Sequence, residues 1–179
     1  AAQREIACFY VDGKGEREVI DRVRRYAEKY GRFFTVFSMR GGSSRYNPLR
    51  YGGVTELTDK LMTIEEWSDP YYESMARRFL QVAFRCLLES GMSVDLPNLV
   101  SYLNVKRLEN LARQLADQNA QGEILEALES YRRSDEIKGL IARLATLVES
   151  EIGHLFKAQG EGNLLDPEEV IKERRSGSL

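Results

Sequence analysis

The chain has 179 residues, of which 42% are hydrophobic and 30% charged, a composition typical of a globular protein with one domain and room for an attached piece of another. Its 26 basic and 28 acidic side chains nearly cancel, so the formal net charge of -2 does not by itself require a nucleic acid or an anionic membrane as partner. The longest apolar runs are too short to cross a bilayer, and no signal-peptide pattern is recognisable.

The N-terminal region predicts a small βαβ element. Residues 5–11 form a continuous apolar run rich in β-formers, as in an interior parallel strand, and the Asp-Gly at 12–13 ends it with a turn. Apolar residues at helical spacing predict a helix over 16–30, and residues 32–37 form a second β-rich run. Two parallel strands leave open edges, so we expect this element to belong to a larger α/β sheet.

After a loop rich in glycine and serine over residues 39–53, the pattern changes to helical periodicity. The helix expected to be most buried has a wide apolar arc and an Asp-Pro start. The predicted fold class is therefore mainly α, a helical bundle-like all-α domain with a small N-terminal βαβ element. We assign residues 1–50 to the βαβ element and linker, and residues 51–163 to the all-α domain. Residues 164–179 are assigned to a segment in which the chain returns toward the domain of the βαβ element. The expected helices cover 54–67, 71–90 (the most buried), 95–103, 105–117, 124–131, 136–158 and a short stretch after 166.

The sequence offers no set of metal ligands and no catalytic group. Cys8 and Cys86 lie within apolar runs, as reduced core cysteines do, and there is no CxxC pair. His154 is the single histidine and has no local partner, so neither a zinc site nor a Ser/His/Asp arrangement can be assembled. The carboxylates are spread along helices, and no acid–base pair stands out.

The segment VDGKGE lies between a predicted strand and a predicted helix, the place where a phosphate-binding loop occurs. It lacks the P-loop pattern, because Gly15 rather than Ser or Thr follows Lys14 and the glycine required five residues before the lysine is absent. A strand-to-helix turn with a solvated lysine is the simpler interpretation.

The candidate for DNA contact is the loop RGGSSRYNPLRYGG. Arg40, Arg45 and Arg50 alternate with Tyr46 and Tyr51, and no acid interrupts the segment. Arginine beside aromatic rings suits phosphate contact and base stacking. A solvated loop whose tyrosines pack on the domain remains an equal alternative. Three further basic pairs are interspersed with acids and are interpreted as solvated helix faces: Arg77-Arg78, Lys106-Arg107 and Arg132-Arg133.

Taken in order, FYVDGKGE, YNPL, EWSDPYYESMARRFL and LDPEEVIKERR resemble the type IV secretion coupling proteins and the related TraD and TraG ATPases of conjugation. In that family a D-x-K-G-E motif ends a strand after the Walker A helix. NPL then leads into an inserted all-α domain, and a segment like LLDPEEVI returns toward the Walker B strand. The resemblance covers nearly the whole chain. Gly13 departs from the proline frequent in the family, and both Walker motifs are missing, so no ATPase activity is expected of this chain itself.

The resemblance implies a parent that is a hexameric bacterial motor anchored in the inner membrane and dependent on ATP and Mg²⁺. This chain would be the cytoplasmic all-α insert with flanking segments of the RecA-like domain, with no cofactor and no membrane contact of its own. Its implied partners are DNA, relaxase or other relaxosome proteins, and neighbouring subunits. The matching residues would lie near the nucleotide or the subunit interface: Asp12, Lys14, Gly15 and Glu16.

The leading hypothesis is a non-catalytic domain that recognises DNA or relaxosome proteins. The first alternative is a module that docks an effector, relaxase or adaptor without contacting DNA. The second alternative is a structural role in positioning neighbours within the ring.

Overall fold

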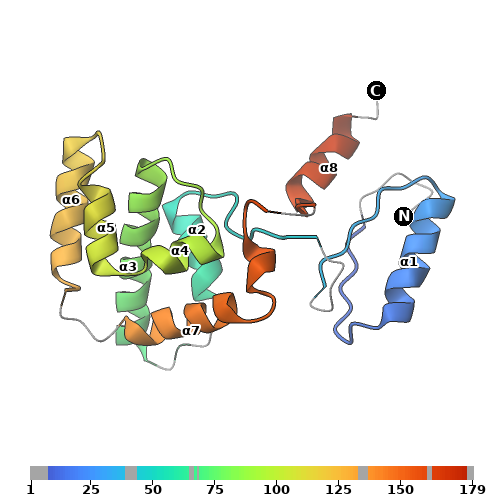
Figure 1. The fold of residues 1–179 in the computed structure, drawn as a ribbon, viewed down its shortest axis with the longest axis horizontal. Coiled ribbons are helices and arrows are strands. Elements are labelled where there is room, and N and C mark those ends of the chain that lie inside the picture. The colour runs from blue at the N-terminus through green and yellow to red at the C-terminus, as the bar shows by residue number, and fades with distance from the viewer. Residues whose placement is uncertain are drawn as a thin grey trace. The chain divides into compact units, whose positions relative to one another are not determined.

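The computed structural model describes residues 8–38, 44–64, 67, 69–132, 137–160 and 163–176. These residues are mainly helical, which confirms the predicted fold class at that level (Figure 1). The helices follow in the order α1 (Arg17–Lys29), α2 (Val54–Met62), α3 (Pro70–Glu89), α4 (Leu96–Tyr102), α5 (Val105–Ala112), α6 (Gln118–Glu129), α7 (Lys138–Glu149), the 3₁₀ helix η2 (Gly153–Phe156) and α8 (Pro167–Ser176).

The chain divides into two compact units. One unit consists of residues 1–46 together with 161–179, and the other is a helical unit of residues 47–160. The first unit is thus built from two segments that flank the helical unit in the sequence. Each unit is described on its own below.

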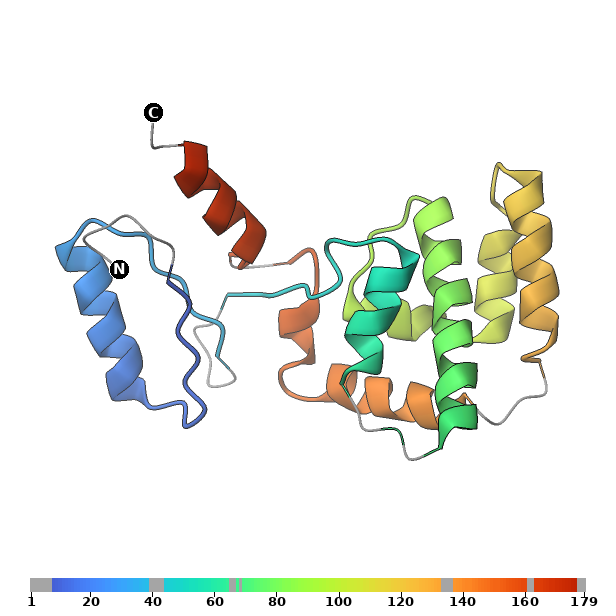
Figure 2. The same cartoon turned by 180° about the vertical axis from the view of Figure 1, so that it is seen from behind.

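Helix α3 is the centre of the helical unit, as its wide apolar arc predicts. It packs against α2, α4, α5 and α6, and Figure 2 shows it between α2 and the α5–α6 pair. Asp69 begins the helix by accepting a hydrogen bond from the Tyr71 N–H at 2.8 Å, and Pro70 occupies the first turn. Its inward face is buried, with six residues at 0% exposure: Phe79, Leu80, Ala83, Phe84, Cys86 and Leu87.

Two predicted helix boundaries are wrong because Asp117 caps the start of one helix and does not end the helix before it. The predicted helix over 105–117 ends at Ala112, and α6 begins at Gln118 instead of 124. The cause is Asp117, whose carboxylate accepts the N–H groups of Asn119 at 2.8 Å and Ala120 at 3.2 Å. Asp117 is therefore the N-cap of a new helix, whereas the sequence pattern placed it at the end of the previous one.

Two other helices end earlier than predicted. Helix α2 stops at Met62 rather than 67, where the Met62 carbonyl accepts a hydrogen bond from the Trp67 indole N–H at 3.1 Å. The long helix predicted over 136–158 is α7 followed by η2, because Ser150 adopts an extended backbone with φ -68° and ψ 164°. Apolar periodicity continues across this break, so spacing alone could not locate it.

The connection between α3 and α4 holds both ends of the helical unit. The Asn47 side-chain amide donates to the Val94 carbonyl at 2.9 Å, and the Asn47 side-chain oxygen accepts from the Leu49 N–H at 3.0 Å. The next residue, Asp95, accepts the Asn98 N–H on one carboxylate oxygen and the Ala158 N–H on the other, both at 2.8 Å. The entry and exit of the helical unit are therefore bonded to two consecutive residues, and we call this arrangement the basal clamp.

We expect Asp95→Ala to lower the free energy of unfolding of the helical unit by about 2 kcal/mol. The substitution leaves two N–H groups without their acceptor, and Asp95 itself is only 9% exposed. Asp69→Ala is the matched control, because Asp69 also caps a helix, where its carboxylate accepts the Tyr71 N–H. Urea unfolding measures both. An Asp95 variant no less stable than the Asp69 variant would contradict the clamp.

The predicted βαβ element is not supported. Helix α1 is present, but neither flanking segment forms a strand within residues 8–16 or 32–38, and residues 5–7 lie outside the described residues. A strand is stabilised by hydrogen bonds to a neighbouring strand, and among the described residues no such neighbour is available. The described apolar side chains of the first run after Cys8, and Phe33 of the second run, are accordingly exposed: Phe9 53%, Tyr10 65%, Val11 92% and Phe33 65%.

The two segments of the first unit meet at a parallel β-bridge between Arg45 and Leu164. The Arg45 N–H donates to the Asn163 carbonyl at 2.8 Å, and the Leu165 N–H donates to the Arg45 carbonyl at 2.7 Å. The residue before Arg45 is also fixed, because the Ser44 N–H donates to the Val36 carbonyl at 2.8 Å. After the helical unit, the chain therefore returns to the first unit beside Arg45, close to the point in the sequence where it left that unit.

The two cysteines differ in environment. The prediction of a core cysteine is wrong for Cys8 and confirmed for Cys86. Cys8 is exposed, because the run that contains it is not covered, whereas Cys86 is buried in α3 with its sulfur 3.6 Å from the Leu108 carbonyl oxygen. Burial raises the pKa of the Cys86 thiol to about 11.

We therefore expect an alkylating reagent at neutral pH to modify Cys8 rapidly and Cys86 only as fast as the helical unit unfolds, because the thiolate is the reactive form. Intact-mass measurements over time, with Cys8→Ser as the control, would follow each thiol. Rapid modification of both thiols in the native protein would show that the α3 environment is open to solvent.

Candidate functional site

The segment VDGKGE forms a tight turn organised by Asp12. The Asp12 carboxylate accepts the Lys14 N–H at 2.9 Å and the Glu16 N–H at 2.7 Å, and Gly15 adopts a positive φ of 64°. Hydrogen bonds from the N–H groups of Glu16 and then Lys14 hold the pKa of Asp12 below its ordinary value. The turn leads directly into α1, whose first residue is Arg17.

Two of the residues predicted to lie near a nucleotide have their N–H groups occupied by this turn. The N–H groups of Lys14 and Glu16 bond to a carboxylate within the turn, so in this geometry they do not face a phosphate. The Lys14 side chain is exposed. The structure brings the four predicted residues together as a helix-entry turn, and their place near a nucleotide or subunit interface stays a prediction.

The first pair of candidate DNA contacts, Arg45 and Tyr46, belongs to the unit that contains α1. The Arg45 backbone is fixed by the β-bridge to Leu164. The Tyr46 ring packs edge-on against Phe37, with centroids 5.8 Å apart and an angle of 68° between the planes. The third predicted arginine, Arg40, lies outside the described residues. Tyr46 therefore packs within its own unit, as the structural alternative for this loop expects.

The second pair, Arg50 and Tyr51, belongs to the helical unit. The Arg50 guanidinium lies over the Tyr51 ring, 5.3 Å from its centroid, and the Tyr51 carbonyl accepts a hydrogen bond from the Lys60 ammonium at 2.7 Å. Leu49, one residue before, is 1% exposed and anchors the segment in the core. This part of the loop is therefore held in place, and an exposed arginine stacked on an aromatic ring is a geometry that suits phosphate or base contact.

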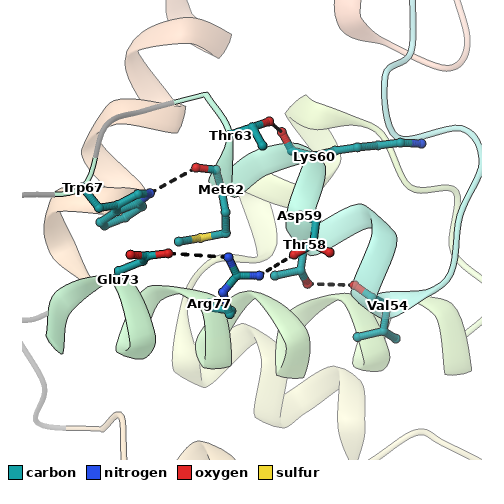
Figure 3. A network of polar contacts seen from close by, with 9 residues as sticks. All are labelled: Val54, Thr58, Asp59, Lys60, Met62, Thr63, Trp67, Glu73 and Arg77. Carbon is teal, nitrogen blue, oxygen red and sulfur yellow. Dashed lines mark hydrogen bonds and ion pairs between the residues drawn. The ribbon is translucent and has the colours of Figure 1, made fainter. Parts of the chain in front are cut away.

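Two other arginines of the helical unit form ion pairs with acids of neighbouring helices. Arg77 on α3 bonds to Asp59 on α2 and lies 3.6 Å from Glu73, as Figure 3 shows. Arg132 bonds to Glu109 on α5 at 2.7 Å, and this contact raises the pKa of its guanidinium. The prediction of simply solvated basic faces is therefore incomplete for these two residues.

Arg85 makes a similar connection, from α3 to Glu123 on α6, at 2.6 Å. The side chains of these ion pairs are about half exposed, apart from Glu109 at 14%, and partly exposed pairs of this kind contribute modestly to stability. Their main consequence is electrostatic, because each pair cancels one positive charge on the surface. Residues 47–160 carry 13 basic and 17 acidic side chains, so the helical unit is net acidic.

Sequence reasoning missed the basal clamp. Asn47 and Asp95 are distant in sequence, and their partners are a carbonyl and an N–H that no motif reveals. A signal was available for Asp95 alone, because an Asp shortly before Pro97 predicts an N-cap.

Within the described residues, no group of three or more His, Cys, Asp or Glu side chains is arranged to hold a metal ion. In the same part of the chain, no helix combines the length and apolarity needed to span a membrane. Comparisons with family models, with curated proteins and with solved structures found no match to this chain.

Proposed function

We propose that the helical unit is a non-catalytic recognition domain inserted into the motor domain of a coupling ATPase for conjugative DNA transfer, where it binds DNA or relaxosome proteins. The observation that supports this most is the inserted geometry. The chain enters the helical unit at Asn47 and leaves it near Ala158, and both ends bond to the consecutive residues Val94 and Asp95. An inserted domain requires adjacent ends of this kind.

The flanking unit supports the same proposal. Its two segments meet at the bridge between Arg45 and Leu164, so the chain returns to the place it left. The segments around Asp12 and Asp166 carry the motifs that resemble the coupling proteins. In this proposal, the exposed Phe9, Tyr10 and Val11 run becomes a strand when a larger RecA-like sheet pairs with it, and ATP and Mg²⁺ bind elsewhere in that motor.

DNA contact in this proposal uses Arg50 stacked on Tyr51, with Arg45 and Arg40 as further contacts. Residues 1–46 add 10 basic against 6 acidic side chains, which favours an anionic ligand near this part of the chain. The motor would supply translocation, and the inserted domain would receive the substrate.

A second candidate function is docking of an effector, relaxase or adaptor protein without DNA contact. It is favoured by the acidic balance of residues 47–160 and by the ion pairs that engage Arg77, Arg85 and Arg132. Fewer cations are then available for phosphate contact than the sequence suggests.

Fluorescence anisotropy with labelled single- and double-stranded DNA separates the two functions. We expect binding that weakens as salt rises, because each phosphate contact releases counterions. Changing Arg40, Arg45 and Arg50 to alanine together should reduce both the affinity and the salt dependence. The matched control changes Arg78, Lys106 and Arg113 to alanine, which removes the same charge from exposed helix positions. If the chain binds no DNA even at low salt, the result contradicts DNA recognition and favours docking of a protein partner.

A further inference from the structure

A very short entry link leads from the first unit into the helical unit. On the side of the first unit, Arg45 is fixed by the β-bridge, where its N–H and its carbonyl form backbone hydrogen bonds of 2.8 and 2.7 Å. On the side of the helical unit, Asn47 is 6% exposed and donates to the Val94 carbonyl at 2.9 Å. Tyr46 is therefore the whole of the entry link between two fixed positions.

The boundary between the two units falls at the peptide bond between Tyr46 and Asn47. The Tyr46 ring packs on Phe37 of the first unit, with centroids 5.8 Å apart, whereas the Asn47 side chain bonds within the helical unit. The ψ angle of Tyr46 and the φ angle of Asn47 lie between these two sets of contacts. A change in either angle therefore turns one unit against the other and breaks none of the contacts.

The exit link contains a glycine in a backbone conformation that other residues rarely adopt. Ala158 is still held by the basal clamp, since its N–H donates to Asp95 at 2.8 Å. Gly160 follows two residues later, is the last residue of the helical unit and has a φ of 144°. Because glycine has no Cβ, it moves between this region and the ordinary ones at little steric cost. The exit link can therefore absorb a change of angle at the entry link.

The two links are anchored close together on each unit. On the helical unit, both are bonded to the consecutive residues Val94 and Asp95. On the first unit, the β-bridge joins Arg45 to Leu164. Two neighbouring connections restrain sliding and twisting, but they leave a swing about the line that joins them. Dihedral changes at a few residues that end such elements are sufficient for a motion of this kind.

We propose that the helical unit swings as a rigid body about a hinge formed by the Tyr46–Asn47 peptide bond and Gly160. The basal clamp keeps the helical unit closed during the swing, and the β-bridge keeps the first unit closed. The motion changes the direction in which the helical unit presents its surface, whichever partner it binds. The hinge therefore goes beyond the proposed function and does not depend on it.

Double electron–electron resonance of the full chain tests the hinge. One nitroxide label is attached to each unit, at Arg22→Cys in α1 and Glu126→Cys in α6, both exposed positions. The background carries Cys8→Ser, and Cys86 stays unlabelled because it is buried. Arg78→Cys with Glu126→Cys is the control pair within the helical unit. We expect the distribution of distances between the units to be about twofold wider than that of the control pair.

Two variants change the links in opposite directions. Gly160→Pro should narrow the distribution between the units, because proline fixes φ at about −65°. Two glycines inserted between Tyr46 and Asn47 should widen it, because the entry link is then no longer a single residue. Gly53→Pro is the matched control, since Gly53 lies inside the helical unit, already has a φ of -82° and has open space around it. It should leave the distribution unchanged.

Equal widths for the two label pairs in the unmodified links would overturn the hinge. A width between the units that neither the proline at 160 nor the inserted glycines change would also overturn it. Urea unfolding of each variant shows that the helical unit remains folded. The resonance measurement contains neither DNA nor a partner protein. A rigid connection would therefore refute the hinge and leave the proposed function to the anisotropy experiment.

Discussion

Replacing Phe79 with alanine should lower the free energy of unfolding of the helical unit by about 4 kcal/mol, the largest effect that we expect from a single substitution. Phe79 is 0% exposed on the buried face of α3, and its ring lies 5.1 Å from the Tyr131 ring beyond α6. The variant loses the transfer free energy of the ring and also leaves a cavity between helices that cannot collapse fully. Since domains are stable by roughly 5–15 kcal/mol, this loss is a large part of the total.

Leu88→Ala is the control for that variant. Leu88 lies on the same helix but is 39% exposed, so its truncation should cost less than about 1 kcal/mol. Denaturant unfolding followed by circular dichroism measures both variants, with tryptophan fluorescence from Trp67 as a second probe. Similar losses in the two variants would mean that α3 is not the centre of the core.

The second large effect is expected at Gly153, which begins η2 after the break that ends α7. A Cβ at this position would overlap the carbonyl oxygen and carbon of Val148, which are backbone atoms and cannot rotate away. We expect Gly153→Ala to destabilise the helical unit by about 3 kcal/mol, because the turn must open to admit the methyl group. Thermal or urea unfolding would record the loss.

Gly122→Ala provides the opposite control. Gly122 lies inside α6, where an added Cβ has nothing within 4 Å, so alanine should stabilise the helix by about 1 kcal/mol through its higher helix propensity. The two glycine variants are therefore expected to change stability in opposite directions. A neutral Gly153 variant would contradict the close packing of the α7–η2 turn.

The sequence was sufficient to predict the helices whose start and buried face are marked by residues close together in the chain. Helix α3 was predicted because Asp69 and Pro70 mark its start and a wide apolar arc follows. Helix α4 was predicted for the same reason, from Asp95 and Pro97. Boundaries failed where one residue fits two roles, as Asp117 does, since it is equally acceptable after one helix and before the next.

The two predicted strands are wrong because a strand depends on its neighbours, and the described residues offer them none. The run containing Phe9 and Val11 has high β propensity, but propensity only describes how well a segment would fit a sheet, and here the segment has no ladder. The basal clamp was hidden for a related reason. Asn47 bonds to Val94 and Asp95 to Ala158, and nothing in one sequence connects positions so far apart.

The candidate site was predictable in its residue types and not in its arrangement. The alternation of arginine and tyrosine predicts DNA contact, which stays a prediction, and it did not indicate that Arg50 would stack on Tyr51. It could not indicate that Tyr46 would pack on Phe37, or that the two pairs would belong to different compact units. The exposed Tyr71 and Tyr72 were likewise not separable, by sequence, from the core-facing residues of α3.

Native-state hydrogen exchange of the full chain distinguishes the proposed insertion, a self-contained helical unit of residues 47–160 closed by the basal clamp, from a chain that opens as a whole. We expect the buried amides of α3, α4 and α7 to exchange with one shared free energy of opening, and those of α1 to exchange independently and faster. Asp95→Ala should lower the shared value and leave α1 unchanged. A common free energy for α1 and α3 would mean that the chain opens as one unit, and it would contradict the insertion.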